Sequence, residues 1–228
     1  LELADASGDR RQGVEIRIRL AEALQFVGSI DSGPLIQGLI DRLDAREITD
    51  PEQVYSVLWM NKWLINNLVD DAGVDLARLR EAVAAMRRRY RRHKQDPQPV
   101  LRAAYGVESH VLGEDAAQGA YAAWVSAPRT DLSDCEACEP TTKARHLVAL
   151  GRHAEALEVA ASVLEGEQVC AEEPEAAIAA LLPSLVLVGR GEEAAELHAA
   201  ACRAIRGRAG AMPIAAVTKN ATGSAISG

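Results

Sequence analysis

The sequence predicts an all-α protein, built as a right-handed α-solenoid of about five antiparallel helix pairs. Three glycines lie 38 residues apart, each opening an Ala- and Glu-rich stretch, and two more continue the series upstream at intervals of 45 and 40 residues. These glycines are Gly28, Gly73, Gly113, Gly151 and Gly189. Such a period is typical of stacked helical units that bury their apolar faces only against neighbours. The composition agrees, because Ala and Leu dominate, Phe occurs once, and no run has the alternating β-branched pattern of a strand.

Capping residues or prolines indicate where helices start, and apolar residues at helical spacing indicate their course. Asp50-Pro51 is the clearest start, because Asp accepts hydrogen bonds at a helix N-terminus and Pro fits the first turn. Asp31 is expected to cap the second helix, whose apolar stripe includes Leu35 and Leu39. The expected pairs are 9–27 with 31–45, 51–68 with 74–93, 99–112 with 114–126, 141–150 with 152–165, and 174–188 with 190–206.

The repetition predicts one helical-repeat domain over residues 1–206, followed by a tail over residues 207–228. The tail is rich in Gly, Ala, Ser and Thr and has no helical stripe, so it is expected to be flexible or a linker. A short strand at MPIAAV, or a segment folded back onto the repeats, is the alternative.

Two stretches carry a family resemblance. Gly151–Ala156 (GRHAEA) and Gly189–Ala194 (GRGEEA), each followed by small residues, resemble the second helix of a tetratricopeptide repeat. The intervals of 38–45 residues exceed the usual 34. The chain is therefore similar to divergent members of that superfamily, and DLSDCEACEP is similar to a group of bacterial tetratricopeptide-like proteins without a well-defined activity. The resemblance implies a scaffold that holds a protein or peptide.

Charge and composition narrow the partners and the compartment. The net charge is −8 with a pI near 5.2, which weighs against a general nucleic-acid binder. No apolar stretch approaches the roughly 18 residues that span a bilayer, and the N-terminus lacks the pattern of a signal peptide. Four cysteines are too few for a disulfide scaffold. A cytoplasmic protein is expected, and the preference for Arg over Lys with abundant Ala suggests a bacterial source.

The cysteines form the sharpest local motif. Cys135-x-x-Cys138 precedes the fourth helix pair, and Cys170 lies in the corresponding loop one unit later. In a solenoid both loops fall on one edge, so three thiolates from neighbouring units are expected to hold a structural zinc ion. Unliganded thiols, or a reversible disulfide within the Cys-x-x-Cys pair, are the alternatives. The candidates for the fourth ligand are His146, His198, Cys202, Asp131 and Asp134.

Two further sets of residues are candidates for binding. By the repeat analogy, the inner groove for a peptide is expected to include Trp63, Asn67, Arg102, His110 and Arg145, although core packing explains the tryptophans equally well. The basic run 87–94 (RRRYRRHK) lies at the end of a predicted helix, where it opposes the negative end of the helix dipole. Contact with an acidic protein or a nucleic acid is the alternative role for that run.

No catalytic motif is recognisable: the sequence has no phosphate-binding glycine loop, nucleophile elbow or His-Glu-x-x-His array. The expected function is a non-catalytic scaffold that binds a protein or peptide, as a regulatory segment of a larger bacterial signalling or assembly protein. The alternatives are a nucleic-acid-associated regulator that uses the 87–94 run, and a carrier whose C-terminal tail is modified or cleaved.

Overall fold

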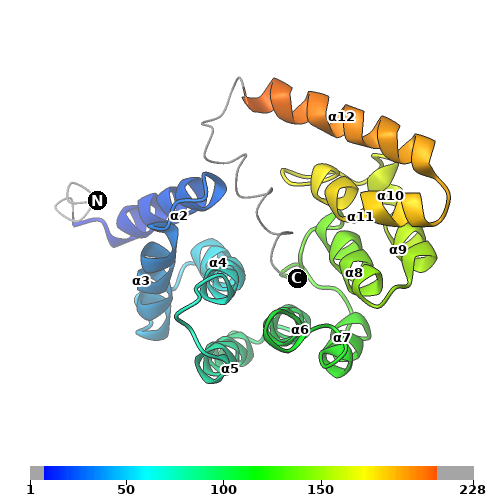
Figure 1. The fold of residues 1–228 in the computed structure, drawn as a ribbon. Coiled ribbons are helices and arrows are strands. Elements are labelled where there is room, and N and C mark those ends of the chain that lie inside the picture. The colour runs from blue at the N-terminus through cyan, green and yellow to red at the C-terminus, as the bar shows by residue number, and fades with distance from the viewer. Residues whose placement is uncertain (1–7, 210–228) are drawn as a thin grey trace. The chain divides into compact units, whose positions relative to one another are not determined.

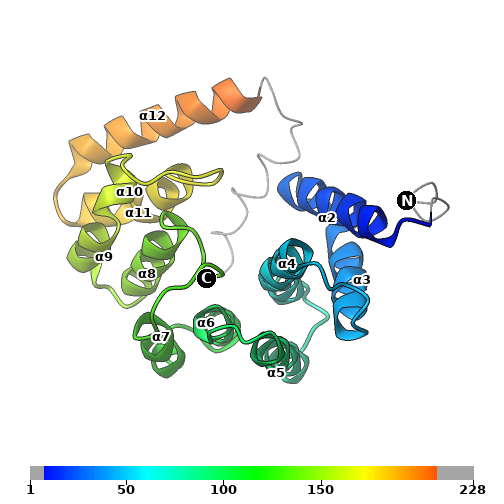
Figure 2. The same ribbon diagram turned by 180° about the vertical axis from the view of Figure 1, so that it is seen from behind.

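The computed structural model describes residues 8–209, and over that range it is entirely helical, without a strand. The chain divides into two compact units, residues 1–133 and 134–228 (Figures 1 and 2). The helices of the first unit are α2 (Arg10–Phe26), α3 (Ser32–Asp44), α4 (Pro51–Val69), α5 (Leu76–Arg92), α6 (Gln98–Leu112) and α7 (Gln118–Val125). Those of the second are α8 (Cys138–Ala149), α9 (His153–Val159), α10 (Ala161–Leu164), α11 (Glu175–Leu187) and α12 (Gly191–Ala209).

The all-helical class predicted from the sequence is confirmed, and each expected helix is present. The helix expected over 152–165 is interrupted at Ala160, which separates α9 from the single turn of α10. The last helix continues to Ala209, three residues past its predicted end. The tail expected from residue 207 lies, from residue 210 onward, outside the described residues.

Side-chain caps explain where several helices start. Asp50 accepts from the backbone N–H groups of Glu52 and Gln53, with Pro51 as the first residue of α4. Asp75 accepts from the N–H of Arg78 at the start of α5. Asp31 precedes α3, but its side chain makes no capping bond to that helix, so the cap predicted there is wrong.

The turns within two pairs use the repeated glycines. Gly151 and Gly189 have positive φ angles of 72° and 84°, a backbone conformation that glycine adopts without strain. Their N–H groups donate to the carbonyls of Val148 and Val186, three residues back, so each glycine closes the preceding helix. Gly73 belongs to the same series but does not have a positive φ, so the turn after α4 is built differently.

The first unit packs consecutive helices against one another, and its alternate helices α2, α4 and α6 are also in contact. Its core is aliphatic, and Ile36, Leu39, Ile40 and Leu58 are completely buried. In the second unit α11 packs against α8, α9, α10 and α12. That core is built from smaller side chains, namely Ala144, Leu147, Ala156, Leu157, Ala160, Leu181, Leu185 and Ala194.

The chain leaving α7 does not run free but is fixed to α4 and α6. The buried Nζ of Lys62 donates to the carbonyl of Leu132 at 2.8 Å and lies 3.3 Å from the centre of the Trp59 ring. The hydroxyl of Ser133 donates to Oε1 of Gln98, also at 2.8 Å. Residues 130–133, predicted as part of a polar connection, therefore belong to the core of the first unit.

Aromatic side chains join α6 to α7. Tyr105 stacks on Trp124 with 5.3 Å between ring centroids, and Tyr121 meets both rings edge-on. The hydroxyl of Tyr105 donates to the carboxylate of Glu114 at 3.0 Å. Burial, followed by the negative charge of Glu114, raises the pKa of Tyr105 above its usual value of 10. The cluster therefore holds a neutral phenol.

We expect the stability contributed by Tyr105 to be lost at high pH. Below about pH 10 the phenol is neutral in both states, but above it the unfolded tyrosine ionises while the folded one stays protonated, which favours unfolding. Replacing Tyr105 with Phe is expected to cost about 1 kcal/mol near neutral pH, through loss of the hydrogen bond. Urea unfolding of both proteins at about pH 8 and about pH 11 checks this, since the difference between them should shrink at the higher pH. A difference that is constant across this range would contradict it.

Candidate metal centre

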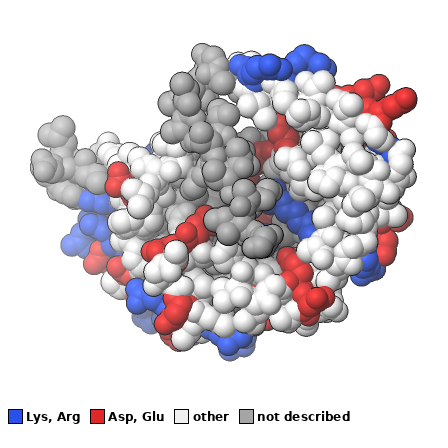
Figure 3. All heavy atoms as spheres, viewed as in Figure 1, with Lys and Arg blue, Asp and Glu red and all other residues white. Residues whose placement is uncertain are grey.

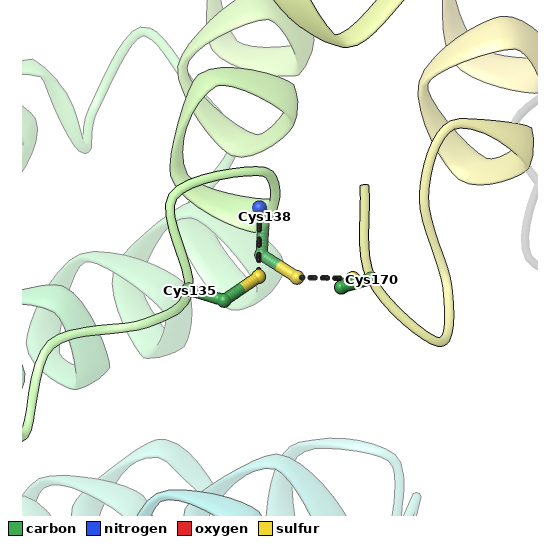
Figure 4. Close-up of side chains that lie close together, drawn as sticks. All are labelled: Cys135, Cys138 and Cys170. Carbon is green, nitrogen blue, oxygen red and sulfur yellow. Dashed lines mark hydrogen bonds between the residues drawn. The ribbon is translucent and has the colours of Figure 1, made fainter. Parts of the chain in front are cut away.

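Three cysteines converge at the start of α8. Cys138 is the first residue of that helix, Cys135 lies in the turn before it, and Cys170 lies in the loop between α10 and α11 (Figure 4). Their Sγ atoms all lie within 4.8 Å of one another, and those of Cys138 and Cys170 are 3.6 Å apart. The structure therefore brings together the three thiols that the sequence predicted as zinc ligands, from two segments 32 residues apart.

Backbone amides are directed at the sulfur atoms. The N–H of Cys138 donates to Sγ of Cys135 at 3.2 Å, because the turn preceding α8 folds back over the cysteine three residues earlier. The N–H of Glu172 donates to Sγ of Cys170 at 3.5 Å. Such amides stabilise a thiolate, and the N-terminus of α8 adds the positive end of a helix dipole. No sequence pattern indicated the amide of Glu172, because it depends on the fold of one loop.

Burial raises the pKa values of the Cys138 and Cys170 thiols. Burial is the largest cause that raises the pKa of Cys138, and the neighbouring thiols of Cys135 and Cys170 raise it further. The pKa of Cys170 is also raised by burial, against which the N–H groups of Glu172 and Glu173 act. Three thiolates this close repel one another unless a cation lies between them, so metal binding here must displace protons.

An apolar cluster supports the thiols from behind. Ala137, Val163 and Ala177 are buried, and they pack against Cys135 and Cys170. These residues come from the turn before α8, from α10 and from α11, so the position of the sulfurs is tied to the packing of three helices. A rigid apolar backing also lowers the local dielectric constant, which strengthens the attraction between thiolates and a cation.

The histidines and carboxylates proposed as fourth ligand do not join the cysteines. Over residues 134–209, no histidine, aspartate or glutamate comes within 4.8 Å of all three sulfur atoms. His146 is buried two turns further along α8, about 12 Å from Cys138 at the helical rise of 1.5 Å per residue. His198 instead contacts Cys202 within α12, with 3.4 Å between Nε2 and Sγ.

Asp131, the remaining proposed ligand, is part of the first unit. Its backbone carbonyl accepts a hydrogen bond from the hydroxyl of Tyr55 at 2.8 Å, which fixes the segment to α4. The described part of the second unit thus offers three thiols to a metal, and a tetrahedral ion bound there would take its fourth ligand from outside residues 134–209.

The residues expected in a peptide groove have mostly structural contacts. Trp63 is half-buried and meets Phe26 edge-on, with 6.0 Å between ring centroids. The amide of Asn67 donates to the side chains of Gln25 and Ser32, which joins α4 to α2 and α3. These contacts favour the packing role that the sequence left open for Trp63.

The other three groove candidates differ in their surroundings. The guanidinium of Arg102 lies 5.2 Å from the centre of the Trp124 ring. His110 and Arg145 are both exposed, His110 in the first unit and Arg145 in the second. The contact of Arg102 with Trp124 is within the first unit and does not by itself indicate a peptide.

The basic run lies at the C-terminal end of α5, as predicted, and several of its charges are paired. Arg89 and Arg92 both bind the carboxylate of Asp44, at 2.9 and 3.0 Å, and Arg88 binds Glu81 at 2.8 Å. On the face drawn in Figure 3, acidic and basic side chains are scattered among uncharged ones. Arg88, Arg89 and Arg92 are therefore engaged in contacts within the first unit.

Comparison with known protein families, with curated proteins and with solved structures finds no significant match. None of the helices within residues 8–209 has the length and apolar character needed to cross a membrane. The function must therefore be inferred from the geometry within each of the two units.

Proposed function

We propose that this chain is a non-catalytic helical-repeat scaffold of the tetratricopeptide type that binds a protein or peptide, and that a zinc ion held by Cys135, Cys138 and Cys170 stabilises its second unit. The observation that carries the proposal is the convergence of three sulfur atoms within 4.8 Å, from the start of α8 and from the loop before α11. A metal at this point links two successive helix pairs, in addition to the apolar contacts between them and the hydrogen bond between His153 and Ser184.

The ligand set favours zinc over other common cations. Thiolates are soft ligands, which excludes magnesium and calcium as preferred ions, and zinc accepts three thiolates with a fourth ligand from solvent or a partner. Zinc is also redox-inactive, which suits a structural role in a protein with reduced cysteines. The amides of Cys138 and Glu172 would then act as donors to the bound thiolates.

The packing of the first unit supports the scaffold part of the proposal. Contacts between α2, α4 and α6, in addition to those between consecutive helices, are what a stack of helix pairs requires. Extended stacks of this kind offer long surfaces on which a protein or peptide can bind. Stacks of tetratricopeptide repeats are right-handed. We extend that handedness to this chain as part of the proposal.

The metal content tests the zinc part directly. Protein purified without chelators is expected to hold close to one zinc ion per chain by elemental analysis, and cobalt(II) substitution is expected to give the absorption of a thiolate complex. The Cys202→Ser variant is the matched control, because Cys202 lies in α12 and contacts His198 instead of the three thiols. Absence of zinc, with no thiolate absorption after cobalt addition, would show that the three thiols are ordinary loop residues.

The scaffold part has a separate test. Affinity capture from the source cell, followed by measured binding of the purified partner, is expected to yield a protein that binds the isolated chain without a chemical change in either molecule. If every captured protein is converted to a product, or if none binds the purified chain, the scaffold function is refuted.

A further inference from the structure

A groove between α5 and α6 has the features of a binding surface for one kind of helix. It encloses about 410 Å³, and its apolar part is formed by Val83 and Ala84 from α5 together with Ala104 and Val107 from α6. Two of these four residues are alanines, so a third helix could approach closely, as it does where small side chains line a helix interface. The apolar floor alone does not identify an occupant, but its surroundings do.

Arginines from one helix line the groove. Arg80, Arg87, Arg88 and Arg91 all come from α5 and contribute to its wall. Arg80 and Arg88 are partly engaged, at 3.7 Å from Glu108 and 2.8 Å from Glu81, and more than half of each side chain is exposed. The side chains of Arg87 and Arg91 have no hydrogen-bond or ion-pair partner within residues 8–209, in contrast to Arg89 and Arg92 of the same run.

The spacing of the two uncommitted arginines suits a helical ligand. Arg87 and Arg91 are four residues apart on α5, so their guanidinium groups lie on the same helix face, one turn from each other. Two carboxylates that are four residues apart on a second helix are also one turn apart, so their spacing matches that of the two guanidinium groups. From Arg80 to Arg91 the basic edge is about 16 Å long, which corresponds to three turns of a partner helix.

Other charged ligands fit the groove less well. Surfaces that bind single-stranded nucleic acids combine cations with aromatic side chains that stack on bases, but no aromatic residue among residues 8–209 lines this groove. Glu108 lies at its edge, where it would repel a phosphate backbone, and the whole chain carries a net charge of −8. The apolar floor, by contrast, matches the apolar stripe of an amphipathic helix.

We propose that the α5–α6 groove binds an acidic amphipathic helix of a partner protein, with its apolar stripe on the floor and carboxylates at positions i and i+4 paired with Arg91 and Arg87. Each guanidinium can donate two parallel hydrogen bonds to one carboxylate, which makes the contact geometrically specific as well as strong. This inference names the partner of the proposed scaffold and so rests on that function, but it is independent of the metal centre.

The test uses the full chain and three synthetic helical peptides of about four turns. All three share one apolar stripe, which is flanked at i and i+4 by Glu, by Gln or by Lys. The Glu peptide is expected to bind at least about tenfold more tightly than the Gln peptide at low salt, and to lose most of this advantage at high salt. Titration calorimetry or fluorescence anisotropy measures both constants.

A charge reversal makes the test specific. The double variant Arg87→Glu with Arg91→Glu is expected to lose the Glu peptide and to prefer the Lys peptide. Arg78→Glu with Arg203→Glu changes the net charge equally at exposed sites outside the groove, and it should leave the preference for the Glu peptide unchanged. Circular dichroism of both variants establishes that each is folded as the parent is.

Several outcomes would overturn the inference. They are equal binding of the Glu and Gln peptides, no binding of the Glu peptide, and no effect of the double reversal. Binding of an oligonucleotide, or self-association of the chain, that the same reversal abolishes would assign the groove to a different occupant. If a captured natural partner still binds the double variant, the groove assignment fails while the scaffold function stands; if no partner binds the chain at all, the scaffold function itself fails.

Discussion

Replacing Cys170 with serine is expected to abolish tight zinc binding and to lower the melting temperature of the second unit. Changes to groups that only support a metal ligand commonly reduce affinity by about 10–100-fold, so loss of a ligand is expected to exceed about 100-fold. In the proposed zinc site, Cys170 is the ligand from the loop before α11, and without it only Cys135 and Cys138, from one segment, would remain to bind the ion. Metal binding then no longer links that loop to α8, and its free energy no longer adds to the stability of the unit.

Chelator competition measures the affinity, and calorimetric melting measures the stability. The Cys202→Ser variant, altered within α12, should match the parent in both. Adding a chelator to the parent should reproduce the loss seen in the Cys170 variant, and adding it to the variant should cause little further change. A Cys170 variant that melts as the parent does in the presence of zinc would contradict a structural role for the ion.

Replacing Trp124 with alanine is expected to destabilise the first unit by about 3–5 kcal/mol, the usual cost of removing a large buried aromatic side chain. Trp124 is completely buried and contacts Tyr105 and Tyr121, and the guanidinium of Arg102 lies over its ring. The truncation therefore leaves a cavity between α6 and α7 and also removes the cation–π contact. Denaturant unfolding followed by circular dichroism measures the loss.

Trp124→Phe is the control, since it keeps an aromatic ring in the cluster and should cost less than the alanine variant. Zinc content should be the same in all three proteins, because the three cysteines belong to the other unit. A loss below about 1 kcal/mol in Trp124→Ala, the typical effect of an ordinary substitution, would mean that the aromatic cluster is not what joins α6 to α7.

The helices could be predicted because their signals are local. Asp50 and Pro51 start α4, and Gly151 and Gly189 close the helices that precede them, each through contacts within a few residues. The cap predicted at Asp31 is wrong because a suitable residue type does not fix the side-chain direction: the carboxylate of Asp31 accepts no hydrogen bond from the first turn of α3. The backbone N–H of Asp31 donates to the hydroxyl oxygen of Ser29. The sequence signal gives the position of that helix but not its cap.

The contacts between distant segments had no comparable signal. Asp44 is 45 residues from Arg89, and Leu132 is 70 residues from Lys62, so neither pair follows from spacing along one helix. The proximity of the three cysteines was predictable because successive packed helix pairs bring their loops near each other, whereas a fourth ligand was not predictable. His146 is separated from Cys138 by two turns of the same helix, so it lies too far along α8 to share their metal.

The hydrogen bond between Lys62 and the carbonyl of Leu132 determines where this chain can be divided into separately expressed fragments. A fragment that ended with α7 would lack the carbonyl of Leu132, and the buried ammonium group of Lys62 would lose that hydrogen bond, at a cost of about 1–3 kcal/mol. A fragment that extended through Ser133 would keep that contact. Only Asp134 lies between Ser133 and Cys135, the first thiol of the second unit. The last fixed residue of the first unit and the first thiol of the second are thus almost adjacent in the sequence, and truncations designed by the ends of the helices would remove residues that belong to the core of the first unit.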